Sequence, residues 1–283
     1  MTRLRRAIDE AAGTLAQAGI DSARVDAELL AAHTAGIDRG RLPFHDPEEP
    51  FYDSYRTVVD ARSRRIPLQH LTASAAFGPV VLEVGPGVFI PRPETESMLE
   101  WALGQRLPQR PLIVDLCTGS GALAVALADA TPGAHVIAVE DSAQALAYAR
   151  RNCAGRDVEL VEADVTLPGL LGERDGLVDL VVSNPPYIPD GAVLDPEVAE
   201  HDPAHALFGG PDGMRVIGPI VTLAARLLVP GGFVAVEHDD DTAAATVALI
   251  EHSGAFADVA SRRDLAGRPR FVTAVKKGSG YKP

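Results

Sequence analysis

The first 75 residues have apolar side chains at helical spacing. Apolar residues recur every three or four positions, at Leu4, Ile8, Ala11 and Leu15. The pattern predicts a helix that ends near Gly19, a second around residues 25–30, and a third over residues 52–65. We therefore expect a small helical bundle over residues 1–75.

The next segment alternates apolar residues with Gly and Pro. Residues 77–91 predict a β-hairpin with its turn at Gly85-Pro86-Gly87, and Pro91 and Pro93 stiffen the exit. We interpret residues 76–96 as a β-hairpin linker between two domains.

From residue 111 onward, short apolar strands alternate with helices. The predicted strands are 112–116, 135–139, 158–161, 178–182 and 233–237. The predicted helices are 121–130, 142–152 and 242–251. Two further strands, 257–260 and 270–275, are expected to close the sheet as a hairpin. The alternation predicts an α/β fold over residues 97–283: a doubly wound, mostly parallel, seven-stranded sheet covered on both faces.

A glycine-rich loop, Asp115–Gly121, follows the first of these strands and opens a helix. Glycine lets a backbone approach a ligand, and a helix N-terminus presents free N–H groups. Glu140 ends the next strand, where a carboxylate can accept hydrogen bonds from two ribose hydroxyls. Asp164, after the third strand, either meets an adenine ring or is only a loop carboxylate or a helix cap. The loop predicts a nucleoside-bearing cofactor and leaves NAD and S-adenosylmethionine both open.

The segment Asn184-Pro185-Pro186-Tyr187 follows the fourth strand, which lies beside the first at the switch point of a doubly wound sheet. The two loops can therefore face one cavity. Proline has no N–H, so this backbone offers only hydrogen-bond acceptors. The Asn184 side-chain oxygen and the Pro185 carbonyl can each accept one N–H of a planar –NH₂ group, with Tyr187 as a flat wall. The alternative is a rigid Pro-Pro turn without a ligand.

Composition and charge narrow the function classes. The 283 residues are 46% hydrophobic and 23% charged, which is typical of globular proteins. The net charge of −13 is a poor match to a nucleic-acid duplex, because phosphate contacts require a basic surface. No uncharged apolar run is long enough to span a membrane, and no signal peptide is evident. With Cys117 and Cys153 as the only cysteines, we expect a cytoplasmic protein without a disulfide framework.

These motifs resemble a known family. Asn184–Tyr187 with an upstream glycine-rich loop is similar to the class I S-adenosylmethionine-dependent methyltransferases that modify planar nitrogens. The segment Phe89-Ile-Pro-Arg-Pro-Glu-Thr-Glu96 and the helical N-terminal region resemble the release-factor glutamine N5-methyltransferases. The resemblance runs from about residue 4 to about residue 276 and includes Val236–His238 and Asp264–Arg270.

The resemblance implies a fold and a reaction. The fold is a Rossmann-like methyltransferase sheet. The reaction transfers a methyl group from S-adenosylmethionine to the glutamine N5 of the Gly-Gly-Gln motif in bacterial peptide-chain release factors. It leaves S-adenosylhomocysteine and modulates translation termination. The helical domain would help to dock the release factor. We also expect a monomer with no metal ion and no direct nucleic-acid contact.

The resemblance also assigns site residues. The cofactor would contact Cys117, Thr118, Gly119, Ser120, Gly121, Glu140, Asp164, Val165 and Asn184. The substrate amide would contact Asn184, Pro185, Pro186 and Tyr187, with Phe89 and Pro91 as walls. The catalytic residues would be Asn184, Pro185 and Tyr187.

Three positions depart from the family pattern. The family often has Gly where Cys117 stands, Asp where Glu140 stands, and Gly where Asp239 stands. Glu140 keeps the carboxylate but adds a methylene, which puts the ribose geometry in doubt. None of the three departures touches Asn184–Tyr187.

Other functions remain open on the residues alone. A ribosomal-protein glutamine methyltransferase would use the same amide chemistry on another partner. An adenine N6 or guanine N2 methyltransferase also uses Asn-Pro-Pro-Tyr, but it must reach an extruded base and usually needs a basic surface. An NAD-dependent oxidoreductase fits the loop spacing, but no catalytic constellation for hydride transfer follows it. A non-enzymatic cofactor-binding scaffold is the fourth possibility.

Two weaker signals have ordinary interpretations. His201 and His205 have the spacing of helical metal ligands, but Pro203 between them argues against a regular helix. A basic cluster at Arg62, Arg64 and Arg65 is interpreted as a solvated helix end, with contact to an acidic partner or RNA as the alternative.

Overall fold

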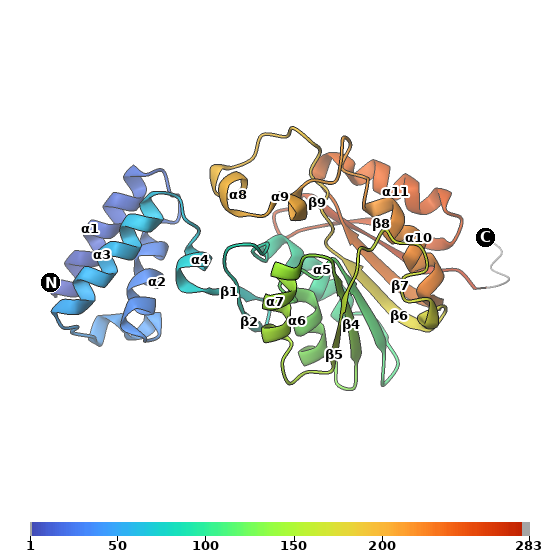
Figure 1. The fold of residues 1–283 in the computed structure, drawn as a ribbon, viewed down its shortest axis with the longest axis horizontal. Helices are drawn as coiled ribbons and strands as arrows, with labels where there is room; N and C mark the ends of the chain where they lie inside the picture. The colour runs from blue at the N-terminus through green and yellow to red at the C-terminus, as the bar shows by residue number, and fades with distance from the viewer. Residues whose placement is uncertain (1, 279–283) are drawn as a thin grey trace. The chain divides into compact units, whose positions relative to one another are not determined.

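The computed structural model describes residues 2–278, and its internal contacts divide the chain into two units. The helical unit comprises the chain up to Ser74 together with Leu194–His201. The sheet unit comprises Ala75–Val193 and the chain from Asp202 onward. Figure 1 shows the elements of both units.

The helical unit is a bundle around one apolar core. Its elements are α1 (Arg3–Gln17), α2 (Ala23–Ala35), the 3₁₀-helix η1 (Arg39–Phe44), α3 (Glu49–Ser63), α4 (Leu68–Thr72) and α8 (Pro196–His201). The predicted apolar stripe Leu4, Ile8, Ala11 and Leu15 lies in the core, so the predicted bundle is confirmed. α3 begins three residues earlier than predicted, because Pro50 is well suited to a first helical turn.

The basic cluster at the end of α3 is solvated at Arg64, whose side chain is 61% exposed, but the prediction was wrong for Arg62. The Arg62 side chain is 5% exposed, its Nε donates to Asp26 at 2.7 Å, and its Nη1 lies 2.9 Å from Glu197 Oε1. Arg65 also pairs with Glu197, at 3.2 Å, and Arg64 pairs with Asp60. Glu197 comes from α8, far along the chain, and local charge patterning cannot show such a partner.

The sheet unit contains the predicted seven-stranded sheet. Its strands are β3 (Leu112–Leu116), β4 (His135–Glu140), β5 (Val158–Glu162), β6 (Val178–Ser183), β7 (Leu228–Glu237), β8 (Phe256–Arg263) and β9 (Pro269–Lys276). The spatial order is β5-β4-β3-β6-β7-β9-β8. The first five strands are parallel, and β9 pairs antiparallel with both β7 and β8. The doubly wound fold and its closing hairpin are confirmed.

Helices cover both faces of this sheet (Figure 1). One face packs against α5 (Pro93–Leu103), α6 (Ala122–Ala130) and α7 (Ala143–Asn152). The other packs against α10 (Ile217–Leu227) and α11 (Ala243–His252). Burial on both faces explains why the central strands are continuous apolar runs instead of alternating ones. The apolar helix α10 and the early start of β7 were not predicted.

A small two-stranded sheet is formed by β1 (Ser74–Phe77) and β2 (Val80–Glu83). The predicted hairpin is therefore present, but its turn was placed wrongly. The strands are joined by Gly78 and Pro79, and Gly78 has a φ of +50°. Gly85–Gly87 lies beyond the second strand, in the approach to α5. Two neighbouring Gly-Pro pairs made the choice of turn ambiguous in the sequence.

Candidate functional site

The glycine-rich loop leaves β3 at Asp115 and is held by that buried carboxyl. One Asp115 oxygen, Oδ2, accepts hydrogen bonds from the Thr118 hydroxyl at 2.5 Å and from the Ala124 N–H at 3.1 Å. Complete burial raises the pKa of Asp115 to about 7. Asp115 therefore ties the end of the strand to the first turn of α6.

The two glycines of this loop have different surroundings. Gly121 has a φ of +86°, and a Cβ there would lie 3.2 Å from Cys153 Sγ. Gly119 has a φ of +58°, and a Cβ there would meet no atom within 4 Å. Gly121 is thus required by packing within the protein, whereas Gly119 borders open space. A bare loop in front of a helix N-terminus fits the nucleoside-bearing cofactor expected from the sequence.

Glu140 ends β4 beside this loop, as expected. Its Oε2 accepts a hydrogen bond from the Gly119 N–H at 2.8 Å, and its Oε1 accepts one from the Ser142 N–H at 3.0 Å. Burial raises its pKa, and the two backbone hydrogen bonds oppose that shift. A carboxylate oxygen has more than one lone pair, so each can accept a further hydrogen bond from a ribose hydroxyl. Glu140 therefore shapes the loop, and its expected contact with a ribose stays a prediction.

Asp164 and Val165 follow β5. Asp164 Oδ1 accepts a hydrogen bond from the Thr166 N–H at 2.8 Å, and this bond is the main cause of its lowered pKa. Val165 is buried in the core that faces α10. Asp164 is thus a loop carboxylate with one oxygen bonded to the backbone, and its expected contact with adenine stays a prediction.

Asn184 follows β6 directly, and β6 is hydrogen-bonded to β3. The register pairs Ser183 with Leu116, so Asn184 and Cys117 start their loops from matched positions at one edge of the sheet. The Asn184 Nδ2 donates a hydrogen bond to the Thr95 hydroxyl of α5 at 3.2 Å. The structure therefore brings the two predicted loops together, as the sequence indicated.

The other end of the segment is fixed through the tyrosine hydroxyl. Tyr187 Oη donates a hydrogen bond to Glu237 Oε1 at 2.9 Å. Glu237 ends β7 and is 1% exposed, and burial raises its pKa to about 7. Arg270, which pairs with Asp264, opposes that shift. Burial also raises the pKa of Tyr187 well above its usual value, so the phenol stays a donor.

Phe89 and Pro91 lie just before α5, where walls were expected. The Arg92 guanidinium lies over the Phe89 ring, 5.0 Å from its centroid. Arg92 also pairs with the buried Asp202 carboxylate, which accepts a hydrogen bond from the Ile90 N–H at 3.4 Å. The segment is thus held from both its side chains and its backbone.

Three buried polar residues beside the site lie in segments that the sequence analysis singled out, but it gave them no role: Thr95, Asp115 and Glu237. A signal existed for two of them, because Asp115 and Glu237 are charged residues at the ends of otherwise apolar strands. Thr95 had only its place in the segment Phe89–Glu96 as a signal, since threonine is common near the start of a helix.

The weaker candidates have ordinary partners. His201 ends α8, with its ring 6.2 Å from that of His70, and Pro203 precedes the short helix α9 (Ala204–Leu207). His205 instead hydrogen-bonds Asp141 at 2.7 Å. Burial and nearby carboxylates raise the pKa of Cys117, so its thiol stays neutral despite the helix N-terminus beside it.

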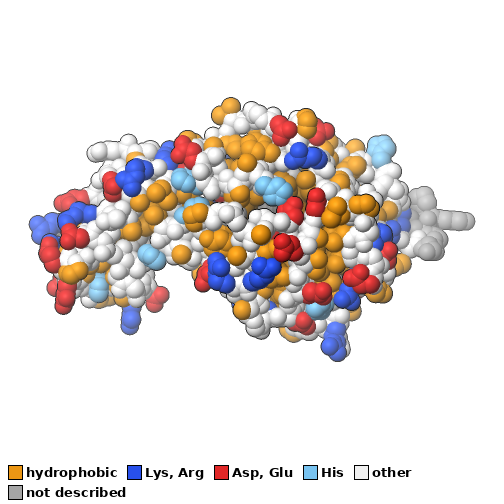
Figure 2. Space-filling view, in the orientation of Figure 1, with side chains coloured by type: hydrophobic (Ala, Val, Ile, Leu, Met, Phe, Trp, Pro, Cys, Tyr) orange, Lys and Arg blue, Asp and Glu red, His pale blue; other side chains and the backbone are white. Residues whose placement is uncertain are grey.

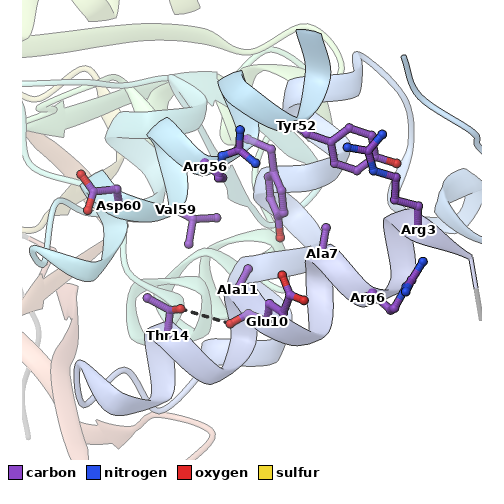
Figure 3. A pocket seen from close by; sticks show the side chains of 11 residues that line it. Arg3, Arg6, Ala7, Glu10, Ala11, Thr14, Tyr52, Arg56, Val59 and Asp60 are labelled. Carbon is purple, nitrogen blue, oxygen red and sulfur yellow. Dashed lines mark hydrogen bonds between the residues drawn. The ribbon is translucent and has the colours of Figure 1, made fainter. Parts of the chain in front are cut away.

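A separate pocket of about 630 Å³ lies between α1 and α3 of the helical unit (Figure 3). Arg3, Arg6 and Arg56 surround it together with Tyr52 and Asp60. None of the residues predicted for cofactor or substrate lines it. It is a feature of the helical unit alone.

Comparisons with known proteins agree with this geometry. The profile described as "PrmC N-terminal domain" matches residues 6–72, and the one described as "Methyltransferase small domain" matches residues 97–201. The "Release factor glutamine methyltransferase" of Mycolicibacterium smegmatis is 66% identical over 98% of this chain and 99% of its own. The protein of the same name from Streptomyces coelicolor is 46% identical over 98% and 99%.

The chain belongs to the release factor glutamine methyltransferase family. The match covers both units, so the family includes the helical bundle as well as the sheet. The chain is therefore an enzyme, a methyltransferase. Among solved structures, the "ribosomal protein L11 methylase" of Lactobacillus delbrueckii aligns with a TM-score of 0.48 at 19% identity, over 70% of this chain and 86% of that one.

Proposed function

We propose that the enzyme transfers a methyl group from S-adenosylmethionine to the side-chain N5 of the Gly-Gly-Gln glutamine in bacterial peptide-chain release factors. The observation that carries the proposal is the Asn184–Tyr187 segment. It places an amide oxygen and a proline carbonyl, with no backbone N–H at either proline, beside the glycine-rich loop. The names of the relatives supply the release factor as the partner.

The cofactor would bind at the loop Cys117–Gly121. Glu140 would accept hydrogen bonds from its ribose, and Asp164 and Val165 would lie against its adenine. The open space at Gly119 and the free N–H groups of α6 fit such a ligand. When bound, S-adenosylmethionine supplies a methyl group on a sulfonium, which needs no further activation.

The chain's own residues would align the acceptor. An amide nitrogen is a weak nucleophile because its lone pair is delocalised. Asn184 Oδ1 and the Pro185 carbonyl would each accept one of its N–H groups, which orients the lone pair and favours positive charge on nitrogen. Tyr187, Pro186, Phe89 and Pro91 would hold the planar group. When the C–N bond forms, one amide proton is released, and no covalent enzyme intermediate is required.

The remaining parts of the proposal concern partners. The helical unit would help to dock the release factor, and the enzyme would act as a monomer in the cytoplasm, where its substrate works. No helix among the described residues is long and apolar enough to cross a bilayer. On the face drawn in Figure 2, basic and acidic side chains are interspersed, and the net charge is −13. Both observations about charge favour a protein substrate over direct nucleic-acid binding.

The test is transfer of a labelled methyl group from S-adenosylmethionine to purified bacterial release factor. The matched control is the same factor with the Gly-Gly-Gln glutamine changed to alanine. Label on the intact factor alone is the expected result. Label on neither factor, with cofactor binding confirmed by calorimetry, would contradict the proposal. Ribosomal proteins and then RNA would be the next acceptors to test.

A further inference from the structure

We propose that Thr95 and Glu237 are positioning residues that fix the orientation of the Asn184 amide and of the Tyr187 ring for glutamine binding. The inference rests on the proposed function. Neither residue lies in the glycine-rich loop or in the Asn184–Tyr187 segment. They come from α5 and from the end of β7, and together they hold both ends of that segment.

The first end is held at Asn184. Its Nδ2 lies 3.2 Å from Thr95 Oγ1, and Thr95 is 4% exposed. The amide of an asparagine can face either way, and only its hydrogen-bond partners decide which atom points where. The partner that decides here is the Thr95 hydroxyl, so the direction of the threonine proton matters.

Glu237 offers a buried acceptor for that proton. With its pKa raised to about 7, Glu237 is ionised above neutral pH, and an ionised carboxylate accepts hydrogen bonds and donates none. The Glu237 Oε1 atom accepts a hydrogen bond from Tyr187. The Oε2 atom is buried, and no described residue forms a hydrogen bond with it. The Thr95 hydroxyl is the neighbouring group that most lowers the pKa of this carboxyl. A Thr95 proton directed to Glu237 leaves only oxygen lone pairs for Asn184.

The consequence is a single allowed orientation of Asn184. Because Thr95 then accepts, the amide must present Nδ2 to it and keep Oδ1 free. Oδ1 is the acceptor that a glutamine N–H requires. If the amide were reversed, a donor would face the substrate –NH₂ group, and the two donors would repel. The same carboxylate anchors the Tyr187 hydroxyl at 2.9 Å, so one buried acid orients both side chains.

The first test removes the hydroxyl without removing the bulk. In Thr95→Val, kcat for release-factor methylation is expected to fall about 100-fold, since a small misplacement of a bound group can cost that much. The affinity for S-adenosylmethionine, measured by calorimetry, should not change. Thr95→Ser restores the hydroxyl and should recover most of the activity. Wild-type kcat in Thr95→Val would overturn the inference, and so would an equal loss in Thr95→Ser.

The second test keeps the shape and changes the direction of the proton. Glu237→Gln places an amide opposite Thr95, which can now donate, so Asn184 is no longer restricted to one orientation. We expect a smaller loss of kcat than in Thr95→Val. A Glu237→Gln enzyme with wild-type kcat would overturn the inference, and this variant carries the test if Thr95→Val does not fold.

A matched control is available on the same helix. Ser97 has a buried hydroxyl with no hydrogen-bond partner among the described residues. Ser97→Ala should therefore leave kcat unchanged, and a loss equal to that of Thr95→Val would contradict the inference. Wild-type enzyme in the same assay separates the two proposals. If wild type does not methylate the release factor, the function fails; if it does and the variants match it, only the positioning role fails.

Discussion

Two loops leave the carboxyl ends of β3 and β6, and their backbones have opposite hydrogen-bonding character. In Cys117–Gly121 the N–H groups of Thr118, Gly119 and Gly121 donate within the protein, and the loop leads into the N-terminus of α6, which presents further N–H donors. Asn184–Tyr187 contains two prolines, so it presents carbonyl acceptors. The two strands are hydrogen-bonded neighbours, which places the loops side by side.

The two loops are also held in place by different kinds of hydrogen bond. Carboxyls hold the glycine-rich loop by accepting from its backbone N–H and hydroxyl groups, as Asp115 and Glu140 do. The proline-rich segment has no N–H at either proline to hold, so its side chains are tied instead, through Thr95 and Glu237. A donor loop suits an oxygen-rich cofactor, and an acceptor segment suits an –NH₂ group. The difference shows that a loop without backbone N–H groups favours ligands that donate hydrogen bonds.

The largest expected effect is in the acceptor segment. Asn184→Ala removes one of the two acceptors proposed for the substrate amide, and kcat should fall about 10²- to 10³-fold, the usual cost of one oriented catalytic hydrogen bond. Binding of S-adenosylmethionine, followed by calorimetry, should survive. Retained turnover would contradict the assigned role, and lost cofactor binding would show that the two loops do not act separately.

The next effect separates the two glycines of the donor loop. In Gly121→Ala, the Cβ meets Cys153 Sγ at 3.2 Å in a left-handed backbone, so unfolding by urea should show a loss of about 2 kcal/mol. Gly119→Ala carries only the backbone strain, about 1 kcal/mol, but its methyl group enters the space proposed for the cofactor. Gly119→Ala should therefore weaken S-adenosylmethionine binding. Equal stability losses in both variants would contradict this separation.

A smaller effect concerns the pH dependence of stability. The pKa of Asp115 is raised to about 7 in the folded protein, so the folded state binds a proton that the unfolded state releases near pH 4. This contribution to stability is complete below about pH 4 and is lost as pH rises to about 7. Asp115→Asn lacks the titration, so its stability relative to wild type should increase from pH 5 to pH 8. Parallel curves in urea unfolding would contradict the raised pKa.

The smallest effect is expected at a departure from the family pattern. Cys117 has a φ of +61°, a conformation that glycine adopts without strain. Cys117→Gly relieves about 1 kcal/mol of strain but adds freedom to the unfolded chain, about 0.4–1 kcal/mol. The free energy of unfolding should therefore change by less than about 1 kcal/mol. A loss well above that value would mean that the thiol packing matters more than the backbone.

The order of the seven strands of the large sheet could be predicted because each has its own local pattern, whereas the helix α10 was not predicted. The five parallel strands have short apolar runs, and Asn184–Tyr187 and the glycine-rich loop are contiguous in sequence. The proximity of these two loops could also be predicted, since neighbouring parallel strands end at the same edge of the sheet. The turn at Gly78 was missed because Gly85–Gly87 offered a second, equally suitable signal.

The residues that were missed act over long sequence separations. Thr95 meets Asn184, and Tyr187 meets Glu237, across segments that only the sheet brings together. The prediction for Arg62 was wrong for the same reason, because its partner Glu197 comes from α8. A single sequence shows which side chains can ionise, but the burial that pairs them depends on the assembled fold.

The position of α8 has a consequence for recombination between relatives. Residues 194–201 belong to the helical unit although they lie between two segments of the sheet unit, so the unit is discontinuous in the gene. A chimera that exchanged only the first 74 residues would receive Arg62 and Arg65 with the host's residue at position 197. Where that residue is not acidic, the buried Arg62 would lose its contact with the Glu197 carboxylate and keep the one with Asp26. Two distant segments of the gene therefore encode the helical unit, and such a crossover should be tolerated where both segments come from one parent or the host has an acidic residue at position 197.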